Sequence, residues 1–163
     1  MKFAPWAFSL ATPCGVLRVE GNCYFILSAT LTPLTDEQQP DSLPAGPCEL
    51  YNETRKQLDA YFNDGRNRID LPVMTSGSDF QQRVWTALEK ILPGQTMTYG
   101  QLAREINSSA QAVGNALREN PVALIIPCHR VVAANGLGGY AGETEGALPK
   151  IKQCLLAHES RQH

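Results

Sequence analysis

The chain has 163 residues and a formal net charge of −2, with 43% apolar and 18% charged residues. This composition is ordinary for a folded globular protein of one domain or two small ones, and it excludes extensive disorder. No run approaches the ~20 consecutive apolar residues of a transmembrane helix, and the opening MKFAPWAFSLATPCG is a poor secretory signal. We therefore expect a cytoplasmic protein with no membrane partner.

The charges are unevenly distributed along the chain. Acidic residues outnumber basic ones through residue 75, whereas basic residues outnumber acidic ones between residues 80 and 135. This asymmetry is mild. It permits a polyanionic partner on the second half of the chain without predicting one.

The first half of the chain has the pattern of a small α+β unit. Residues 15–20 and 23–30 are short strand-like runs separated by Gly21-Asn22, a hairpin signal. Apolar residues at helical spacing predict a helix at about 48–63, and residues 69–73 form a short extended segment. Thr75-Ser76-Gly77 is the expected boundary, which gives an N-terminal domain of residues 1–75 and a C-terminal domain of residues 76–163.

The second half is mainly helical, and its first two helices carry clear start signals. Ser78 with Gln81 forms a predicted capping box for one helix, which Pro93-Gly94 ends. Thr98 with Gln101 predicts a second helix start of the same kind.

The segments that follow have the pattern of a winged helix-turn-helix. Ser108 or Ser109 caps a third helix that ends at Asn120-Pro121, and a last helix is expected at about 149–158. Between them, Asn135-Gly136 is a strong turn signal and predicts a small hairpin. Two short helices with a tight connection, then a hairpin, resemble the DNA-binding motif, but plain packing explains the pattern equally well.

The third helix carries small residues where a helical surface usually carries long ones: Ala112, Gly114, Asn115 and Ala116. One interpretation is close packing against a neighbouring helix. The other is close approach to a DNA groove, since a minor groove is too narrow for bulky side chains unless it widens.

The cysteines point to reduced thiols. Their number is odd, and no pair has the CxxC spacing of a zinc site; they stand at positions 14, 23, 48, 128 and 154. We therefore expect neither a disulfide framework nor a metal site. Cys23 and Cys154 lie in apolar contexts and are interpreted as packed thiols.

Cys128 differs from the others because of its neighbours in IIPCHRVV, residues 125–132. A nucleophilic cysteine reacts as the thiolate, which a nearby base or positive charge favours. His129 follows Cys128 directly and would more naturally reach the sulfur through a water. Glu159, in LLAHE, is a candidate to orient that histidine, whereas His158 beside it is interpreted as a surface residue.

Four segments together resemble the O6-alkylguanine-DNA alkyltransferase family, whose members move an alkyl group from guanine to their own cysteine. They are TYGQLA at 98–103, AVGNALREN at 112–120, PCHRVV at 127–132 and LLAHE at 155–159. The resemblance covers about residues 78–159 and is looser before them. It implies a small RNase H-like α/β domain followed by a mainly helical winged helix-turn-helix domain. It also implies that the partner is double-stranded DNA carrying O6-alkylguanine, and we include O4-alkylthymine as a second substrate.

The resemblance also implies roles for individual residues. Cys128 is the acceptor, activated through water by His129, with Glu159 completing the relay and Tyr99 assisting the leaving base at N3. The substrate-binding residues would be Val131, Tyr140, Ala141 and Gly142, with Asn120 and Arg130 as structural support. The DNA-binding residues would be Gln111, Ala112, Gly114, Asn115 and Arg118, the last being otherwise a cation at a helix end. This chemistry needs no metal and no cofactor, and we expect a monomer that turns over once.

The sequence departs from the family pattern at two places. Gln111 stands where the family typically has an arginine that enters the base stack, and glutamine lacks that planar cation. The link after Tyr140 is longer than usual and contains Glu143 and Glu145, and acidic residues near DNA lower affinity.

Three other functions fit the sequence less well. A non-catalytic alkyltransferase-like protein that binds lesions would lack the acceptor cysteine, so Cys128 argues against it, although Gln111 leaves room for it. A Cys-His hydrolase would need a separated base and an oxyanion hole, neither of which is identifiable. A winged-helix transcription factor would leave the PCHR segment unexplained.

Overall fold

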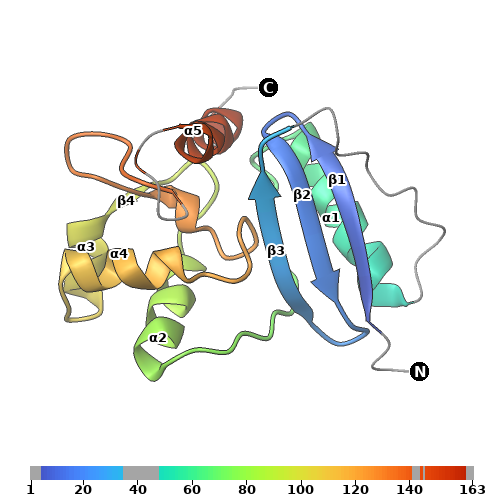
Figure 1. The fold of residues 1–163 in the computed structure, drawn as a ribbon, viewed down its shortest axis with the longest axis horizontal. Coiled ribbons are helices and arrows are strands. Elements are labelled where there is room, and N and C mark those ends of the chain that lie inside the picture. The colour runs from blue at the N-terminus through green and yellow to red at the C-terminus, as the bar shows by residue number, and fades with distance from the viewer. Residues whose placement is uncertain (1–4, 35–47, 141–143, 145, 161–163) are drawn as a thin grey trace.

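The computed structural model describes residues 5–34, 48–140, 144 and 146–160. The fold is α+β: a small antiparallel sheet with one helix forms the N-terminal half, and the helices α2 to α5 form the C-terminal half (Figure 1). The helix α5, residues Ala147–Ser160, lies between the sheet and the other C-terminal helices (Figure 1). Across the described ranges, no helix has the length and apolar character needed to cross a membrane.

The sheet has the order β1-β2-β3, formed by Trp6–Thr12, Gly15–Gly21 and Ile26–Thr32. All neighbours are antiparallel. The helix α1, Glu49–Asn63, covers one face of the sheet (Figure 1). The predicted helix is confirmed to within a residue, whereas the first strand was not predicted and the third begins later than expected.

Aromatic side chains join this sheet to its helix. Trp6 and Phe8 point to the same side of β1, because alternate residues of a strand share a face. Both rings pack edge-on against Tyr51 of α1, with ring centroids 5.3 and 5.5 Å apart. Leu58, two helical turns further along the same face of α1, is fully buried. These contacts fix α1 on the sheet.

The expected Gly21-Asn22 hairpin is built differently from a two-residue turn. The side-chain Oδ1 of Asn22 accepts hydrogen bonds from the backbone amides of Tyr24 and Phe25, both at 2.8 Å. An asparagine side chain that caps the following backbone replaces the tight turn. Ile26 is therefore the first residue of β3, which explains the shift from the predicted start at residue 23.

The helix starts of the C-terminal half were predicted well. The helix α2, Asp79–Leu88, begins after a complete capping box of Ser78 and Gln81. The helix α3, Tyr99–Glu105, has the predicted box of Thr98 and Gln101. Each capping box is formed by residues only three positions apart, so the sequence alone predicts it.

The next helix, α4, spans Ala110–Arg118, and Ser109 caps it by accepting from the backbone amide of Ala112. Of the two predicted caps, Ser109 is therefore the one used. The connection to α3 is short, which keeps the two helices in contact.

A parallel strand pair that the sequence did not predict positions the reactive segment. Cys128–Arg130 forms a single 3₁₀ turn, η1, which leads into β5, Val131–Val132. The strand β5 pairs with β4, Met97–Thr98. Because Tyr99 follows β4 directly, this pairing brings the start of α3 beside the PCHR turn.

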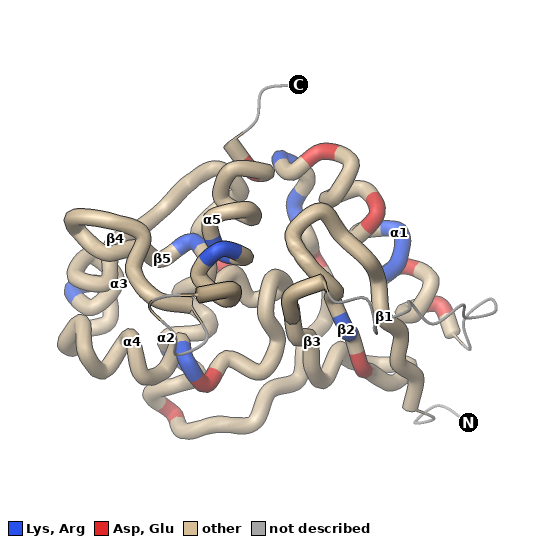
Figure 2. Tube along the Cα trace, turned by 45° about the horizontal axis from the view of Figure 1, so that its top comes forward, with Lys and Arg blue, Asp and Glu red and all other residues tan. Residues whose placement is uncertain are grey.

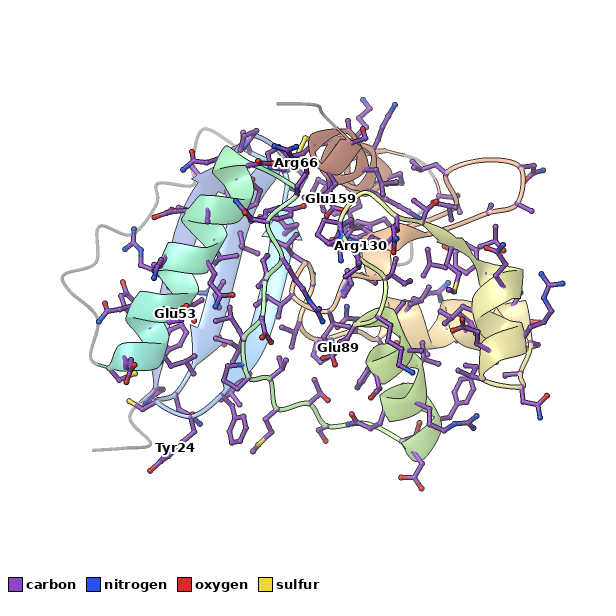
Figure 3. All side chains as sticks on the ribbon, turned by 180° about the vertical axis from the view of Figure 1, so that it is seen from behind. Tyr24, Glu53, Arg66, Glu89, Arg130 and Glu159 are labelled. Atoms are coloured by element: carbon purple, nitrogen blue, oxygen red, sulfur yellow. A yellow bond between two sulfur atoms is a disulfide. The ribbon has the colours of Figure 1, made fainter. Side chains whose placement is uncertain are left out.

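The prediction that Cys14 and Cys154 are reduced thiols is wrong in this structure. The two form a disulfide across a sequence separation of 140 residues. It joins the turn between β1 and β2 to α5, so the N-terminal sheet and the last helix are covalently linked (Figure 3). Nothing in the local spacing of the cysteines indicates this bond, because only the tertiary fold brings them together.

Four residues named from the sequence lie outside the described residues. They are Ala141, Gly142, Glu143 and Glu145. The pocket residues and acidic insertion predicted there therefore stay predictions.

Candidate active site

Cys128 is partly buried and opens the 3₁₀ turn, directly after Pro127. Burial raises the pKa of its thiol, while a hydrogen bond with Asn120 and the positive charge of Lys152 act in the opposite direction. The first effect disfavours the thiolate and the other two favour it. The site thus holds a shielded thiol with two groups that support its ionised form.

His129 is fully buried behind Cys128 and contacts Glu159. Its Nε2 lies 2.7 Å from Oε2 of Glu159. Burial lowers the pKa of His129 even though the carboxylate opposes this, so the imidazole is neutral near pH 7. A neutral imidazole donates from Nε2 to the carboxylate and keeps a lone pair on Nδ1. Among the described residues, this Nδ1 has no hydrogen-bond partner, so it is free to accept a proton.

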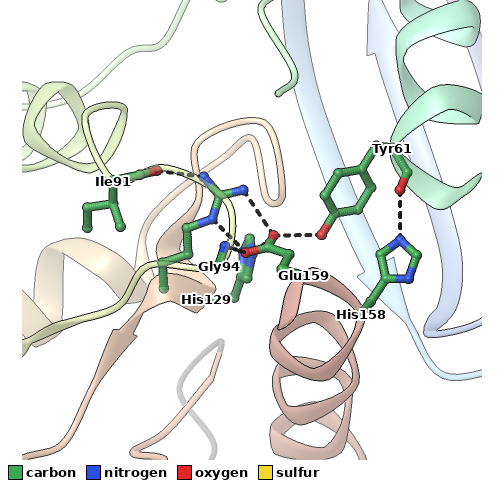
Figure 4. Close-up of polar contacts among 7 residues, drawn as sticks. Tyr61, Ile91, Gly94, His129, His158 and Glu159 are labelled. Carbon is green, nitrogen blue, oxygen red and sulfur yellow. Dashed lines mark hydrogen bonds and ion pairs between the residues drawn. The ribbon is translucent and has the colours of Figure 1, made fainter. Parts of the chain in front are cut away.

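Arg130 holds the same carboxylate in a bidentate ion pair. Its Nε donates to Oε1 of Glu159 at 2.8 Å and its Nη2 to Oε2 at 2.9 Å (Figure 4). A third nitrogen, Nη1, donates to the carbonyl of Ile91 at 2.7 Å. Burial alone would raise the pKa of Glu159, but the hydrogen bonds from His129 and Arg130, together with the positive charge of Arg130, lower it well below its usual range. Glu159 is therefore ionised.

The N-terminal half also contributes to this carboxylate. The hydroxyl of Tyr61, on α1, donates to Oε2 of Glu159 at 2.7 Å (Figure 4). Burial and the negative charge of Glu159 raise the pKa of Tyr61, so the hydroxyl remains a donor. Seen from behind, Arg130 and Glu159 lie between the two halves of the molecule (Figure 3).

The interpretation of His158 as a surface residue is wrong. Its side chain is buried against Tyr61 and Phe62, and its Nε2 lies 2.7 Å from the carbonyl of Tyr61 (Figure 4). His158 therefore anchors the end of α5 to α1. Sequence reasoning missed this because the partner lies 97 residues away.

A cavity of about 420 Å³ opens above Cys128. It is lined by residues from α3, α4, the 3₁₀ turn and the segment before α5: Tyr99, Ala110, Gln111, Gly114, Asn115, Leu117, Arg118, Cys128, Gly139, Tyr140 and Thr144. Such a volume lies in the range of pockets that bind small molecules. The cavity therefore connects the reactive thiol with the exposed side of α4.

Tyr99 and Tyr140 form two walls of this cavity. The hydroxyl of Tyr99 donates weakly to the carbonyl of Gly139 at 3.5 Å, and burial raises its pKa. Gly138 has a positive φ of 77°, and a Cβ there would lie 2.9 Å from the ring of Tyr99. Only glycine fits this close approach. Tyr140 is buried, which raises its pKa too.

The exposed side of α4 has few charges, and its trace is mostly uncharged in Figure 2. Gln111, Asn115 and Arg118 are exposed there and line the cavity. A Cβ added to Gly114 would meet nothing within 4 Å. Packing inside the protein therefore does not explain this glycine, which weakens the interpretation as helix packing. Ala112 lies on the same helix but does not line the cavity.

Asn120 braces the segment that leads to Cys128. Its Nδ2 donates to the carbonyl of Ile126, and its Oδ1 accepts from the amide of Val122, both at 2.9 Å. These contacts brace the loop between α4 and the 3₁₀ turn.

Comparison with known proteins identifies this arrangement. A family model described as "6-O-methylguanine DNA methyltransferase, DNA binding domain" matches residues 79–161. A methylated-DNA–protein-cysteine methyltransferase of Mycolicibacterium paratuberculosis is 36% identical over 153 residues, which cover 92% of this chain and 89% of that protein.

The chain belongs to the 6-O-methylguanine DNA methyltransferase family. A member from Methanosarcina acetivorans is 42% identical over 68% of this chain and 70% of its own length. The crystal structure of the Mycobacterium tuberculosis O6-methylguanine methyltransferase matches with a TM-score of 0.78 and 33% identity, covering 96% of this chain and 93% of that one. A structure of Mycobacterium tuberculosis OGT in complex with DNA matches with a TM-score of 0.75 and 34% identity, covering 93% and 91%.

Sequence reasoning missed two residues of this candidate site. Tyr61 contacts Glu159 from the other half of the chain, and Lys152 is fully buried near Cys128. A signal for Lys152 was present, because it lies between Ile151 and Leu155 on the side of the last helix that faces inward.

Proposed function

We propose that the protein repairs DNA by moving the alkyl group of O6-alkylguanine to the sulfur of Cys128 in one irreversible step. The observation that carries this proposal is the cavity shared by Cys128, Tyr99 and the exposed residues of α4. A base flipped out of the duplex would enter it from the α4 side, because the alkyl–oxygen bond is inaccessible inside the stack. The protein acts as a monomer on double-stranded DNA.

The relay supports an in-line displacement. The thiol proton of Cys128 passes through a water to the free Nδ1 of His129, while Glu159 holds the imidazole by Nε2. The sulfur–carbon bond then forms as the carbon–O6 bond breaks, and the electron pair of the broken bond stays on the base. Guanine takes up one proton as it leaves, which matches the proton that His129 took from the thiol, so the leaving group is neutral guanine. Tyr99 assists at N3 of the leaving base. Since a thioether is stable, each molecule reacts once.

Other residues hold the base or brace the site. The carbonyl of Val131 accepts a hydrogen bond from the exocyclic amine of guanine. Tyr140, Ala141 and Gly142 would close the pocket around the base. The bonds of Asn120 to the active-site loop, and those of Arg130 to Glu159, support bracing roles. On α4, Gln111, Ala112, Gly114, Asn115 and Arg118 face the DNA.

We infer a matching division of the chain. Residues 1–75 form an RNase H-like domain, and residues 76–163 form a winged helix-turn-helix domain in which α4 enters the DNA groove. The short link between α3 and α4 and the isolated bridge between Ala133 and Gly136 support this inference.

The decisive test is the intact mass of the protein after mixing it with duplex DNA that contains O6-methylguanine. We expect a gain corresponding to one methyl group per chain, located on Cys128 and absent in Cys128→Ala. Folded protein that gains no mass overturns the proposal, and tight lesion binding without transfer identifies a non-catalytic binder instead. A second arm with O4-methylthymine tests the extension to that base, whose alkyl–oxygen bond has the same character.

Gln111→Arg is expected to strengthen binding to duplex DNA about tenfold at low salt, because one more cation contacts a phosphate. The dependence of log K on log salt should steepen by about 0.9, and transfer from duplex DNA should become faster. Fluorescence anisotropy at several salt concentrations measures the first two effects. Gln153→Arg adds the same charge at an exposed site on α5 and serves as the control. Equal binding by both variants and the unchanged protein contradicts the prediction.

A further inference from the structure

A hydroxyl group from the N-terminal half shares one carboxylate oxygen with the candidate base. Tyr61, on α1, is fully buried, and its hydroxyl donates to Oε2 of Glu159 at 2.7 Å (Figure 4). The same oxygen accepts from Nε2 of His129 at 2.7 Å and from Nη2 of Arg130 at 2.9 Å. A carboxylate oxygen offers about two lone pairs. The donors therefore compete for Oε2, and each of them weakens the bonds that the others make.

The position of Tyr61 does not depend on its bond to Glu159. Its carbonyl accepts from Nε2 of His158 at 2.7 Å. Its ring packs edge-on against Phe62 and His158, with ring centroids 4.9 and 5.2 Å apart. None of these contacts uses the hydroxyl, so a phenylalanine in place of Tyr61 would keep all of them. The contact between α1 and α5 thus directs a neutral donor at Oε2 of Glu159.

This competition bears on the proton that the relay moves. When Nδ1 of His129 accepts a proton, the ring becomes a cation beside Oε2 of Glu159, and the carboxylate stabilises that cation. The hydroxyl of Tyr61 draws negative charge from the same oxygen, which reduces this stabilisation. The hydroxyl therefore acts in the same direction as burial, which lowers the pKa of His129. Both keep the imidazole neutral, which is the form that accepts the thiol proton.

We propose that Tyr61 is a positioning residue for the transfer reaction: its hydroxyl fixes Oε2 of Glu159 and weakens the hold of that oxygen on a protonated His129. The N-terminal half of the chain thereby sets the lowest pH at which His129 accepts the thiol proton. This inference rests on the proposed function for its part in alkyl transfer. The competition between Tyr61 and His129 for one oxygen exists without DNA, so it is measurable separately.

Other titratable groups surround this arrangement, and removal of the Tyr61 hydroxyl leaves each of them in place. They are Cys128 and Arg130 of the 3₁₀ turn, Lys152 and His158 of α5, and Tyr140 of the segment before α5. The segment before β4 contributes a backbone amide, that of Gly94, at 3.4 Å from Oε1 of Glu159. A change in the behaviour of His129 after loss of the hydroxyl therefore reports on Tyr61 itself.

The test measures single-turnover methyl transfer by Tyr61→Phe and by the unchanged protein as a function of pH. Loss of the hydroxyl strengthens the bond between Glu159 and protonated His129, so the midpoint of the acid limb should rise by about one unit. Below that midpoint the rate should fall about tenfold, while the plateau at higher pH stays within about twofold. Tyr51→Phe removes another buried hydroxyl of α1, one that contacts Arg55 outside the site, and should leave the profile unchanged.

A second measurement needs no DNA. By NMR, the Nε2 proton of His129 should move downfield in Tyr61→Phe as its bond to Glu159 strengthens, whereas the imidazole signals of His158 should stay in place. A ring-fluorinated tyrosine at position 61 is a stronger donor and should shift both the Nε2 proton and the acid midpoint the opposite way.

Each possible result decides one of the two proposals. A rate lowered by the same factor at every pH, or an unmoved Nε2 proton of His129, overturns the role of Tyr61. If Tyr61→Phe does not fold, the protein with fluorinated tyrosine decides alone. A protein that accepts no methyl group from DNA overturns the proposed function, and the NMR result still decides whether Tyr61 and His129 compete for Glu159.

Discussion

Glu159→Gln is expected to lower the free energy of unfolding by about 3–5 kcal/mol and to slow alkyl transfer by about tenfold or more. The loss in stability arises because Arg130 would keep its buried charge without the carboxylate that now accepts two of its hydrogen bonds. The loss in rate arises because glutamine no longer orients His129 or stabilises its protonated form.

The effect should depend on pH in a defined direction. The pKa of Glu159 is lowered in the folded protein, so its contribution to stability is present above the unfolded value of about 4.3. That contribution is lost as the pH falls below this value toward the folded pKa. The difference in stability between the unchanged protein and Glu159→Gln should therefore be constant near neutral pH and shrink in acid.

Urea denaturation at several pH values measures this stability, and single-turnover methyl transfer measures the rate. Glu89→Gln makes the same substitution at an exposed position and should change neither. Tyr61→Phe removes one neutral donor from Oε2 of Glu159 and should cost less than the loss of the charge. A stability loss below 1 kcal/mol in Glu159→Gln would show that the carboxylate is not central.

Removal of the disulfide between Cys14 and Cys154 is expected to lower the free energy of unfolding by about 4–5 kcal/mol. The bond closes a loop across 140 residues of sequence, which restricts the unfolded chain strongly. The double variant Cys14→Ser/Cys154→Ser should therefore unfold at lower urea concentration than the oxidised protein.

A reductant provides the matched control. Treatment of the unchanged protein should lower its stability to that of the double variant, whereas the double variant should not respond. Cys23→Ser removes a thiol outside the bond and should leave the response to reductant intact. If a reductant leaves the midpoint of the unchanged protein where it was, the bond does not stabilise the fold.

The parts of the fold that were predictable from sequence have short-range causes. The capping boxes of Ser78 with Gln81 and of Thr98 with Gln101 each lie within four residues, so the chain alone indicates them. The pairing of β4 with β5 was not predictable, because two residues per strand carry no alternation. The hairpin after β2 was misplaced because the side chain of Asn22, not a glycine turn, shapes it.

The candidate site shows the same division. The PCHR segment and the LLAHE motif indicated Cys128, His129 and Glu159 because they lie in distinctive short segments. Tyr61 was missed, and His158 was misjudged, because their contacts span 98 and 97 residues of sequence. Periodicity places a residue on the inner face of a helix, but it does not name the partner from another element.

The carboxylate of Glu159 is bonded at once by the candidate relay, by Arg130 and by Tyr61 of the other half. Selection for a durable fold and selection for a fast reaction therefore act on the same few side chains. Sequence change at Tyr61 of α1 is therefore constrained by chemistry that belongs to the other half of the chain. Variants at Glu159, Arg130 or Tyr61 should perform poorly both in a screen for stability and in a screen for activity. Neither screen by itself therefore separates an effect on stability from an effect on catalysis.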